Sequence, residues 1–327
     1  MKRRHIVQAL GALALAGNAV FAGSAMAQAY PSKPIRLIVP FAPGGVSDTS
    51  ARVVADKLGQ RLGQQVVVEN KPGASGNIGT AMVAQAAPDG YTLVLGFDGT
   101  MVINPHVYAK VPFDPIKDFV PIGKIGDAAL ILIAHPSVPA KNLQELVAYS
   151  RSREGGLSYG SAGTGSTPHL AGELLKARTG LNMVHVPYKG GGQAMGDLVG
   201  GTLPLLYTAV AGAQQYVKGG KATAIAVSGA SRVPALPDVP TIAESGVPGL
   251  VSESWVGLLA PANTPKEIVD KLSGELNAVV NLPDTRERLA TLGIVPVGNS
   301  SEAFGKQIQA DLKKYSEVVK TAKIRVE

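Results

Sequence analysis

The chain has 327 residues, no cysteine, and a formal net charge of +7 at pH 7 from 31 basic and 24 acidic residues. The absence of cysteine excludes disulfides, thiol catalysis and metal sites built on cysteine. The charges are spread along the chain and form no basic stripe, which argues against a nucleic-acid partner. Aromatic residues make up only 5% of the chain, so a sugar-binding groove lined with stacking rings is not expected.

The first 27 residues have the pattern of a cleaved export signal. Lys2-Arg3-Arg4 gives a basic start, an interrupted apolar run follows over residues 6–22, and Ala25-Met26-Ala27 places small residues where a signal peptidase cuts. Cleavage there would leave 300 residues and a net charge of +4, because three basic and no acidic residues are removed. No later stretch has the roughly 20 apolar residues of a membrane span. We therefore predict a periplasmic protein. The general secretory route is favoured over the twin-arginine route, whose consensus Arg3-Arg4 matches poorly.

Apolar β-rich runs alternate with helical patterns, which is typical of α/β architecture. The first series predicts strands at 35–39, 66–68 and 92–95 and helices at 48–62 and 77–86. The second predicts strands at 129–134, 157–159, 184–186, 205–208, 223–227 and 255–260, with helices at 143–152 and 168–178. Helices at 265–280, 283–292 and 301–322 end the chain.

Two lobes are expected from this order of elements. The helices after residue 261 have no new strand series to cover, so the C-terminal part is predicted to return to the first lobe. The first lobe then comprises residues 28–125 and 252–327, and the second comprises residues 126–251. The chain would cross between them near 123–128 and again near 250–255.

A glycine-rich loop, Pro-Phe-Ala-Pro-Gly-Gly-Val-Ser-Asp over residues 40–48, joins the first strand to the first helix. Gly44 and Gly45 allow the backbone to turn tightly and to approach a ligand. The helix behind them starts with unpaired N–H groups and partial positive charge, which together favour a carboxylate. Ser47 or Asp48 is expected to cap this helix. A plain strand-to-helix turn is the alternative interpretation.

A second loop of the same kind, Tyr-Gly-Ser-Ala-Gly-Thr-Gly-Ser-Thr-Pro-His, covers residues 159–169. Pro168 suits a first helical turn, and Ser166 or Thr167 suits its cap. Each predicted lobe therefore presents one glycine-rich helix N-terminus, and two such ends could hold a dianion or grip one carboxylate from two sides. The glycine-rich segments 73–79, 96–100 and 189–192 either line the same cleft or form surface turns.

Motifs for catalysis and for phosphate or dinucleotide binding are absent from the sequence. The histidines after the signal lack the paired helical spacing of a metal site: His106, His135, His169 and His185. We therefore predict no catalytic residue, no metal and no cofactor. The alternative is an exported serine hydrolase that uses Ser166, with His169 and Asp48 as possible partners.

A series of short motifs follows one another in a specific order. They are Pro-Phe-x-Pro-Gly-Gly-x-x-Asp-x-x-Ala-Arg over 40–52, Glu-Asn-Lys-Pro-Gly-Ala over 69–74, Pro-Asp-Gly-Tyr-Thr-Leu over 88–93, Val-Pro-Tyr-Lys-Gly over 186–190 and Pro-Asp-Val-Pro-Thr over 237–241. In these motifs the chain resembles the Bug-type family, the periplasmic receptors of tripartite tricarboxylate transporters. The resemblance extends over nearly the whole chain after the signal.

The resemblance implies a two-lobed, type II periplasmic binding fold with the ligand in the cleft between the lobes. It implies a small carboxylate ligand, delivered to membrane transporter subunits or reported to a sensor kinase, and we expect a monomer. The resemblance also implies which residues contact the ligand, and we add Thr100 from the loop after the third strand. The expected contacts are Phe41, Gly44, Gly45, Asp48, Thr100, Ser161, Gly163, Ser166, Thr167 and His169.

Three positions depart from the family pattern. Met101 stands where family members often have histidine, and Asp98 places an acid near the predicted cleft. Tyr207 and Thr208 occupy a strand in which many members carry aspartate. The identity of the ligand is therefore not transferable from any one relative. If Asp48 or Asp98 faces the pocket, an amino acid with its ammonium group becomes a competitive ligand.

Overall fold

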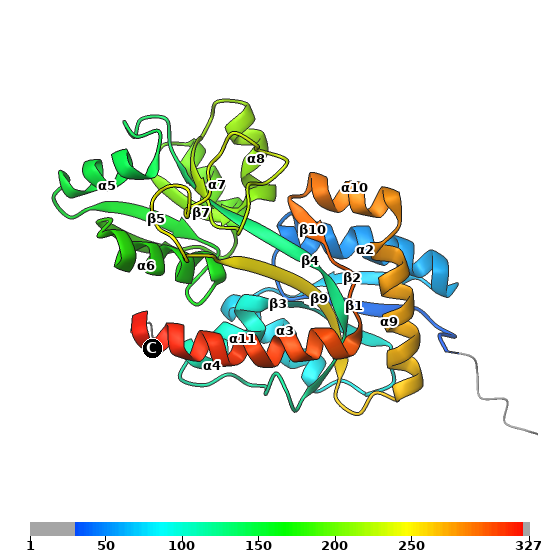
Figure 1. The fold of residues 1–327 in the computed structure, drawn as a ribbon. Helices are drawn as coiled ribbons and strands as arrows, with labels where there is room; N and C mark the ends of the chain where they lie inside the picture. The colour runs from blue at the N-terminus through cyan, green and yellow to red at the C-terminus, as the bar shows by residue number, and fades with distance from the viewer. Residues whose placement is uncertain (1–29, 323–327) are drawn as a thin grey trace, which may run out of the picture. The chain divides into compact units, whose positions relative to one another are not determined.

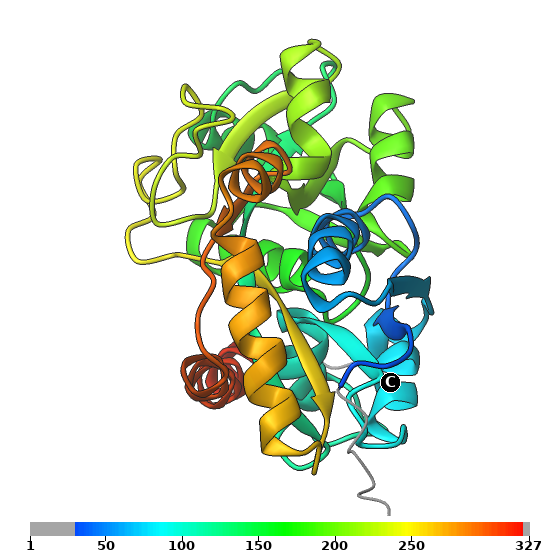
Figure 2. The ribbon, with the colours of Figure 1, turned by 90° about the vertical axis from the view of Figure 1, so that its right-hand side faces the viewer.

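The computed structural model describes residues 30–322, of which those from Lys33 onward belong to one compact unit. The predicted export signal lies outside the described residues. Within residues 30–322, no helix combines the length and the apolar character that crossing a bilayer requires. Figures 1 and 2 show the compact unit from two directions.

The first group of strands begins with three parallel ones, β1 (Ile35–Val39), β2 (Val66–Asn70) and β3 (Thr92–Phe97). β1 lies between the other two, and four of its five side chains are buried. This agrees with a run of almost continuous aliphatic residues, which is typical of a parallel strand covered on both faces. The helices that follow these strands are α2 (Val46–Leu62) and α3 (Asn77–Ala84).

The second group of strands contains β5 (Leu157–Ser161), β6 (Met183–Pro187) and β7 (Leu205–Ala209), which are also parallel. β8 (Thr223–Val227) pairs separately with β4. Four helices belong to this stretch of chain: α5 (Leu143–Arg151), α6 (Thr167–Thr179), α7 (Gly191–Val199) and α8 (Val210–Lys218).

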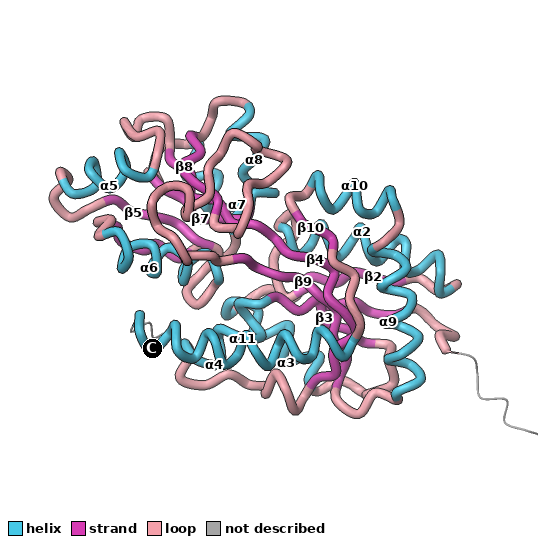
Figure 3. Tube along the Cα trace, viewed as in Figure 1, coloured by secondary structure: helices cyan, strands magenta, loops and turns pink. Residues whose placement is uncertain are grey.

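Two long antiparallel strands connect the groups. β4 (Phe119–Ala134) pairs with β9 (Glu253–Pro261) through its first part and with β7 and β8 through its last part. β9 in turn pairs with β3. The result is one sheet in the order β2-β1-β3-β9-β4-β7-β5-β6. Figure 3 draws the strands in magenta.

The expectation that β4 begins near residue 129 was wrong, because the strand already begins at Phe119. Its first half contains Pro121, Gly123 and Gly126, which the sequence pattern treats as breaks. The pairing with β9 shifts register between Pro121 and Gly123, and again between Lys124 and Gly126. These β-bulges accommodate proline and glycine inside a strand, so composition alone underestimated its length.

The C-terminal helices pack on the connecting strands. α9 (Lys266–Val280) and α11 (Ser301–Ala322) both contact β4, and α9 also contacts α2. Figure 2 shows α9 in orange with α11 in red beside it. α10 (Pro283–Thr291) leads to β10 (Ile294–Pro296), a short strand on β4 that had not been predicted.

Candidate functional site

The candidate site lies where parallel strands end. Because β1, β2 and β3 are parallel, their carboxyl ends lie at one edge of the sheet, and the same holds for β5, β6 and β7. In open α/β sheets, ligands bind in crevices outside these carboxyl ends. Both loops singled out in the sequence leave such an end, the first after β1 and the second after β5.

The first loop ends in a helix whose cap differs from the expectation. α2 begins at Val46, and its N-cap is Gly45, which contributes no side-chain bond, so the prediction that Ser47 or Asp48 caps the helix was wrong. Asp48 instead folds back from the first turn and accepts a hydrogen bond from Gly44 N at 3.0 Å. The carboxylate thereby fixes the turn through which the glycines pass.

Asp48 is only 3% exposed and is satisfied within the protein. Its oxygens also accept bonds from Arg52 Nε at 3.1 Å and Asn70 Nδ2 at 2.9 Å. Burial alone would raise the pKa of this carboxyl, but the bonds from Arg52, Gly44 and Asn70 outweigh it and hold the pKa below its usual value. Asp48 is therefore ionised at neutral pH and paired with Arg52.

Three segments of the first strand group meet beside this loop. The Phe41 ring packs edge-on against Phe97 with centroids 5.2 Å apart. Gly76 lies between Phe41 and Thr100, because a Cβ on Gly76 would contact the first and overlap the second. The Thr100 hydroxyl donates to Ser75 O at 2.8 Å. Of the predicted contacts, Phe41 and Thr100 are thus held close together.

The second loop precedes α6 and is held by its own hydrogen bonds. Ser161 Oγ lies 2.7 Å from His185 Nε2, and it accepts a bond from Gly163 N at 3.1 Å. Ser166, the N-cap of α6, donates from Oγ to Gly163 O at 2.6 Å. His169 Nδ1 accepts from Gly165 N at 3.1 Å. These predicted site residues are buried and brought together.

The two loops are joined through a segment that the sequence marked only as glycine-rich. Ser75 Oγ donates to Thr164 O at 2.7 Å, and Tyr108 OH donates to the same carbonyl at 3.2 Å. Ser75 has a φ of 51°, in the left-handed region that a residue other than glycine rarely adopts. Such strain costs about 1–3 kcal/mol and is concentrated at functional sites. No pattern near Tyr108 in the sequence marks it as a residue of the site.

The contact between Ser75 and the second loop requires a glycine at position 163. Its φ is 129°, and a Cβ would lie 3.1 Å from both Ser75 Oγ and Tyr188 O. A side chain there would therefore press against Ser75 and against the backbone of Tyr188. Ser75, Thr164 and Tyr108 are referred to below as the loop junction.

Asp98 occupies the other contact between the strand groups. Its carboxylate is fully buried and accepts bonds from Thr167 Oγ1 at 2.6 Å and from Ser254 Oγ. Thr167 begins α6, whereas Ser254 belongs to β9. Burial raises the pKa of Asp98 to about 7, although the bonds from Ser254, Thr167 and Gly99 lower it. Within residues 30–322, Asp98 makes no ion pair with a cationic side chain.

The residues after Asp98 had been predicted as a loop, but they form a helix. η2 (Gly99–Ile103) has π-helical bonding and runs into α4 (Asn104–Val107). Single π-helical turns are rare and frequently lie at functional sites. Met101, one of the departures from the family pattern, is fully buried in η2.

The structure does not assemble the possible catalytic set of Ser166, His169 and Asp48. The Ser166 hydroxyl donates its hydrogen bond to Gly163 O, and Asp48 forms an ion pair with Arg52. His169 instead stacks on His185 with ring centroids 3.8 Å apart. Burial lowers the pKa of His169 to about 4 and, together with His169, lowers that of His185 to about 3. Over the described part of the chain, no three His, Cys, Asp or Glu side chains form a metal-binding group.

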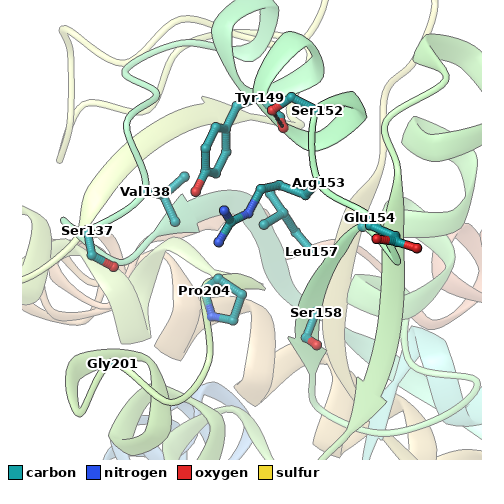
Figure 4. Close-up of a pocket in the computed structure, with 11 residues that line it drawn as sticks. Ser137, Val138, Tyr149, Ser152, Arg153, Glu154, Leu157, Ser158, Gly201 and Pro204 are labelled. Carbon is teal, nitrogen blue, oxygen red and sulfur yellow. Dashed lines mark hydrogen bonds between the residues drawn. The ribbon is translucent and has the colours of Figure 1, made fainter.

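A separate cavity of about 740 Å³ lies away from these loops. It is lined by Tyr149, Arg153 and Leu157 among others, and the Arg153 guanidinium points into it (Figure 4). Leu157 is the first residue of β5, whereas the second loop follows the last residue of that strand. This cavity therefore lies at the opposite end of β5 from the candidate site.

Two groups of parallel strands, each bearing a glycine-rich loop and joined by a long strand pair, define a two-lobed periplasmic binding protein of the α/β class. Solved structures of such proteins match the chain closely. The periplasmic binding protein BugD aligns with a TM-score of 0.86 and 38% identity, over 91% of this chain and 100% of that one. An R. palustris protein with adipate aligns with a TM-score of 0.88 and 35% identity, over 90% of this chain and 99% of that one. MatC from Rhodopseudomonas palustris with bound malate aligns with a TM-score of 0.84 and 33% identity, over 89% of this chain and 100% of that one.

The chain belongs to the tripartite tricarboxylate transporter family of receptors, TctC, whose model matches residues 50–324. Protein BugT of Bordetella pertussis is 34% identical over 304 residues, which cover 93% of each chain. The predicted resemblance to Bug-type receptors and the predicted fold class are thereby confirmed. The family is one of solute-binding receptors.

Proposed function

We propose that this protein is a periplasmic receptor that captures a small organic carboxylate between its two glycine-rich loops. The observation that carries the proposal is that segment 73–76 bridges the two loops: Ser75 donates to Thr164 O of the second loop, and Gly76 lies against Phe41 of the first. The adipate and malate in two related structures support the same ligand class.

The chemistry of the converging segments favours an anion bound by neutral donors. Residues 40–48, 73–76, 97–100 and 161–169 contain no lysine or arginine. They contain glycines and hydroxyl residues, and both loops lead into helices whose first N–H groups have no intrahelical partner. Helix N-termini bind carboxylates through these N–H groups and through the helix dipole. No resident metal or cofactor is needed for this binding.

We further propose where the receptor acts, how its chain divides into lobes and which partners it serves. After removal of residues 1–27, residues 28–125 and 252–327 would form one lobe and residues 126–251 the other. The lobes would close on the ligand and then present it to membrane transporter subunits or to a sensor kinase. We expect the receptor to act as a monomer.

A thermal-shift screen tests the ligand class. Carboxylic acids of two to six carbons are each compared with their methyl ester and their amide. A ligand that binds only the folded state stabilises it by about 2.7 kcal/mol at 100 times its dissociation constant, which corresponds to a rise of several degrees in Tm. We expect such a rise for acids alone. Equal shifts by the neutral esters would contradict binding of an anion.

We also propose that the protein catalyses no reaction at these loops. Among the described residues of these loops, Ser161 is the serine whose Oγ contacts a histidine nitrogen, His185 Nε2. However, Ser161 is fully buried, and a histidine whose pKa is about 3 is a weak general base at neutral pH.

We therefore expect no turnover of p-nitrophenyl acetate or butyrate above the rate of denatured protein. Ser161→Ala and Ser166→Ala are expected to leave that background rate unchanged. Turnover by the wild-type protein that disappears in either variant would instead favour the hydrolase.

A further inference from the structure

We propose that Asp98 supplies the anion for the N-terminus of α6 and thereby selects ligands with a single carboxylate. The other end of such a ligand would be neutral or cationic. This inference rests on the proposed carboxylate-binding function and names the ligand class of the same site.

Asp98 lies where the first strand group meets α6. It directly follows Phe97, the last residue of β3, whose ring contacts Phe41 of the first loop. Its carboxylate accepts the hydroxyl of Thr167, the first residue of α6. The backbone also comes close here, since a Cβ on Gly99 would lie 3.4 Å from Thr167 N. An acidic group is therefore already in place where α6 presents its partial positive charge.

The ionisable groups around Asp98 do not compensate its negative charge. The ionisable groups that face it from α11 are Asp311, which is acidic, and Tyr315, which is buried and neutral. α6 and β9 contribute the hydroxyls of Thr167 and Ser254. His169, two residues beyond Thr167 in α6, is kept neutral by its lowered pKa of about 4. No cation in residues 30–322 pairs with Asp98, so a second carboxylate brought to α6 would meet uncompensated negative charge.

The first loop offers the opposite environment. Gly44 and Gly45 are exposed, and no heavy atom lies within 4 Å of the position that a Cβ would take on either. The one nearby acid, Asp48, is paired with Arg52. A ligand carboxylate can therefore approach the start of α2, while the far end of the ligand faces the side held by Asp98.

The selectivity should depend on pH with a defined sign. The burial of Asp98 raises its pKa to about 7, so the carboxyl is mostly neutral at pH 6 and mostly charged at pH 8. Discrimination against dicarboxylates should accordingly be strong at pH 8 and weaker at pH 6.

The test measures dissociation constants by calorimetry at pH 6 and pH 8 for matched ligands of four, five and six carbons. At six carbons the set is hexanoate, 6-aminohexanoate and adipate. We expect the wild type at pH 8 to bind hexanoate or 6-aminohexanoate at least about tenfold more tightly than adipate. The ratio of the dissociation constants of adipate and that ligand should fall at least about threefold at pH 6. In Asp98→Asn the ratio should fall about tenfold at pH 8 and no longer change with pH.

Thr167→Val is the matched comparison, since it keeps the Asp98 carboxyl but removes a hydrogen bond that lowers its pKa. The preference for a single carboxylate should persist, and its loss on acidification should begin at a higher pH than in the wild type. Tight binding of dicarboxylates by the wild type, or an equal change for all three ligands in Asp98→Asn, overturns the inference but leaves the proposed function intact. If no carboxylate of any length binds, the proposed function itself fails. Should Asp98→Asn not fold, the wild-type ratio at the two pH values decides.

Discussion

Gly45→Val is expected to weaken carboxylate binding by at least about 100-fold while the protein remains folded. Gly45 has a φ of −80°, which any residue adopts, and no heavy atom lies within 4 Å of its ideal Cβ. Valine therefore fits the fold but occupies the space in front of the first N–H groups of α2. Each hydrogen bond to a charged group contributes about 1.5–3 kcal/mol, so the loss of two accounts for the expected factor.

Calorimetry with the best acid of the thermal-shift screen, together with the Tm of the free protein, checks this expectation. Gly274→Val is the matched control, because Gly274 lies in α9 and also has open space around its ideal Cβ. It should bind as the wild type does. Wild-type affinity in a folded Gly45→Val protein would show that the first loop is not the binding site.

Removal of the loop junction is expected to weaken ligand binding by roughly 30-fold. Ser75→Ala combined with Tyr108→Phe deletes both hydroxyls that donate to Thr164 O. These bonds can form only when the second loop lies against Ser75 and Tyr108, so we expect them to stabilise a closed state of the receptor selectively. Two hydrogen bonds at about 1 kcal/mol each correspond to that factor. Alanine keeps the Cβ at position 75, so the backbone strain there is unchanged.

Small-angle scattering and binding kinetics measure this effect. The wild type should become more compact at saturating ligand, and the double variant should need more ligand for the same compaction and release it faster. Ser137→Ala is a suitable control, since it removes a hydroxyl beside the separate cavity at the far end of β5. An unchanged dissociation constant in the double variant, or a wild type that does not compact, would contradict closure through this junction.

The sequence predicted the elements whose signals are local. Glycines between an apolar strand and a helix mark both loops, because tight turns and close approach restrict the choice of residue at those positions. The strands β1, β3 and β5 and the helices α6, α9 and α11 were found within a few residues of their observed bounds. Both loops lie at the carboxyl ends of parallel strands.

What the sequence missed depends on contacts between distant segments. Ser75 and Thr164 are 89 residues apart, and Asp98 and Ser254 are 156 apart, so no pattern along the chain links them. The partner of Ser161 turned out to be His185, which lies on the neighbouring strand β6. The burial of Asp98 depends on Thr167 and Ser254 together, and composition cannot report such a meeting.

The position of β9 in the sheet has a consequence for the order in which the chain folds. β9 lies between β3 and β4 in the sheet, yet it begins only at Glu253, long after both neighbours have been synthesised. β3 therefore remains an unpaired edge while most of the chain emerges, and pairing over such sequence distances is slow. A chain that cannot pair β3 with β9 early therefore completes its sheet only late in folding.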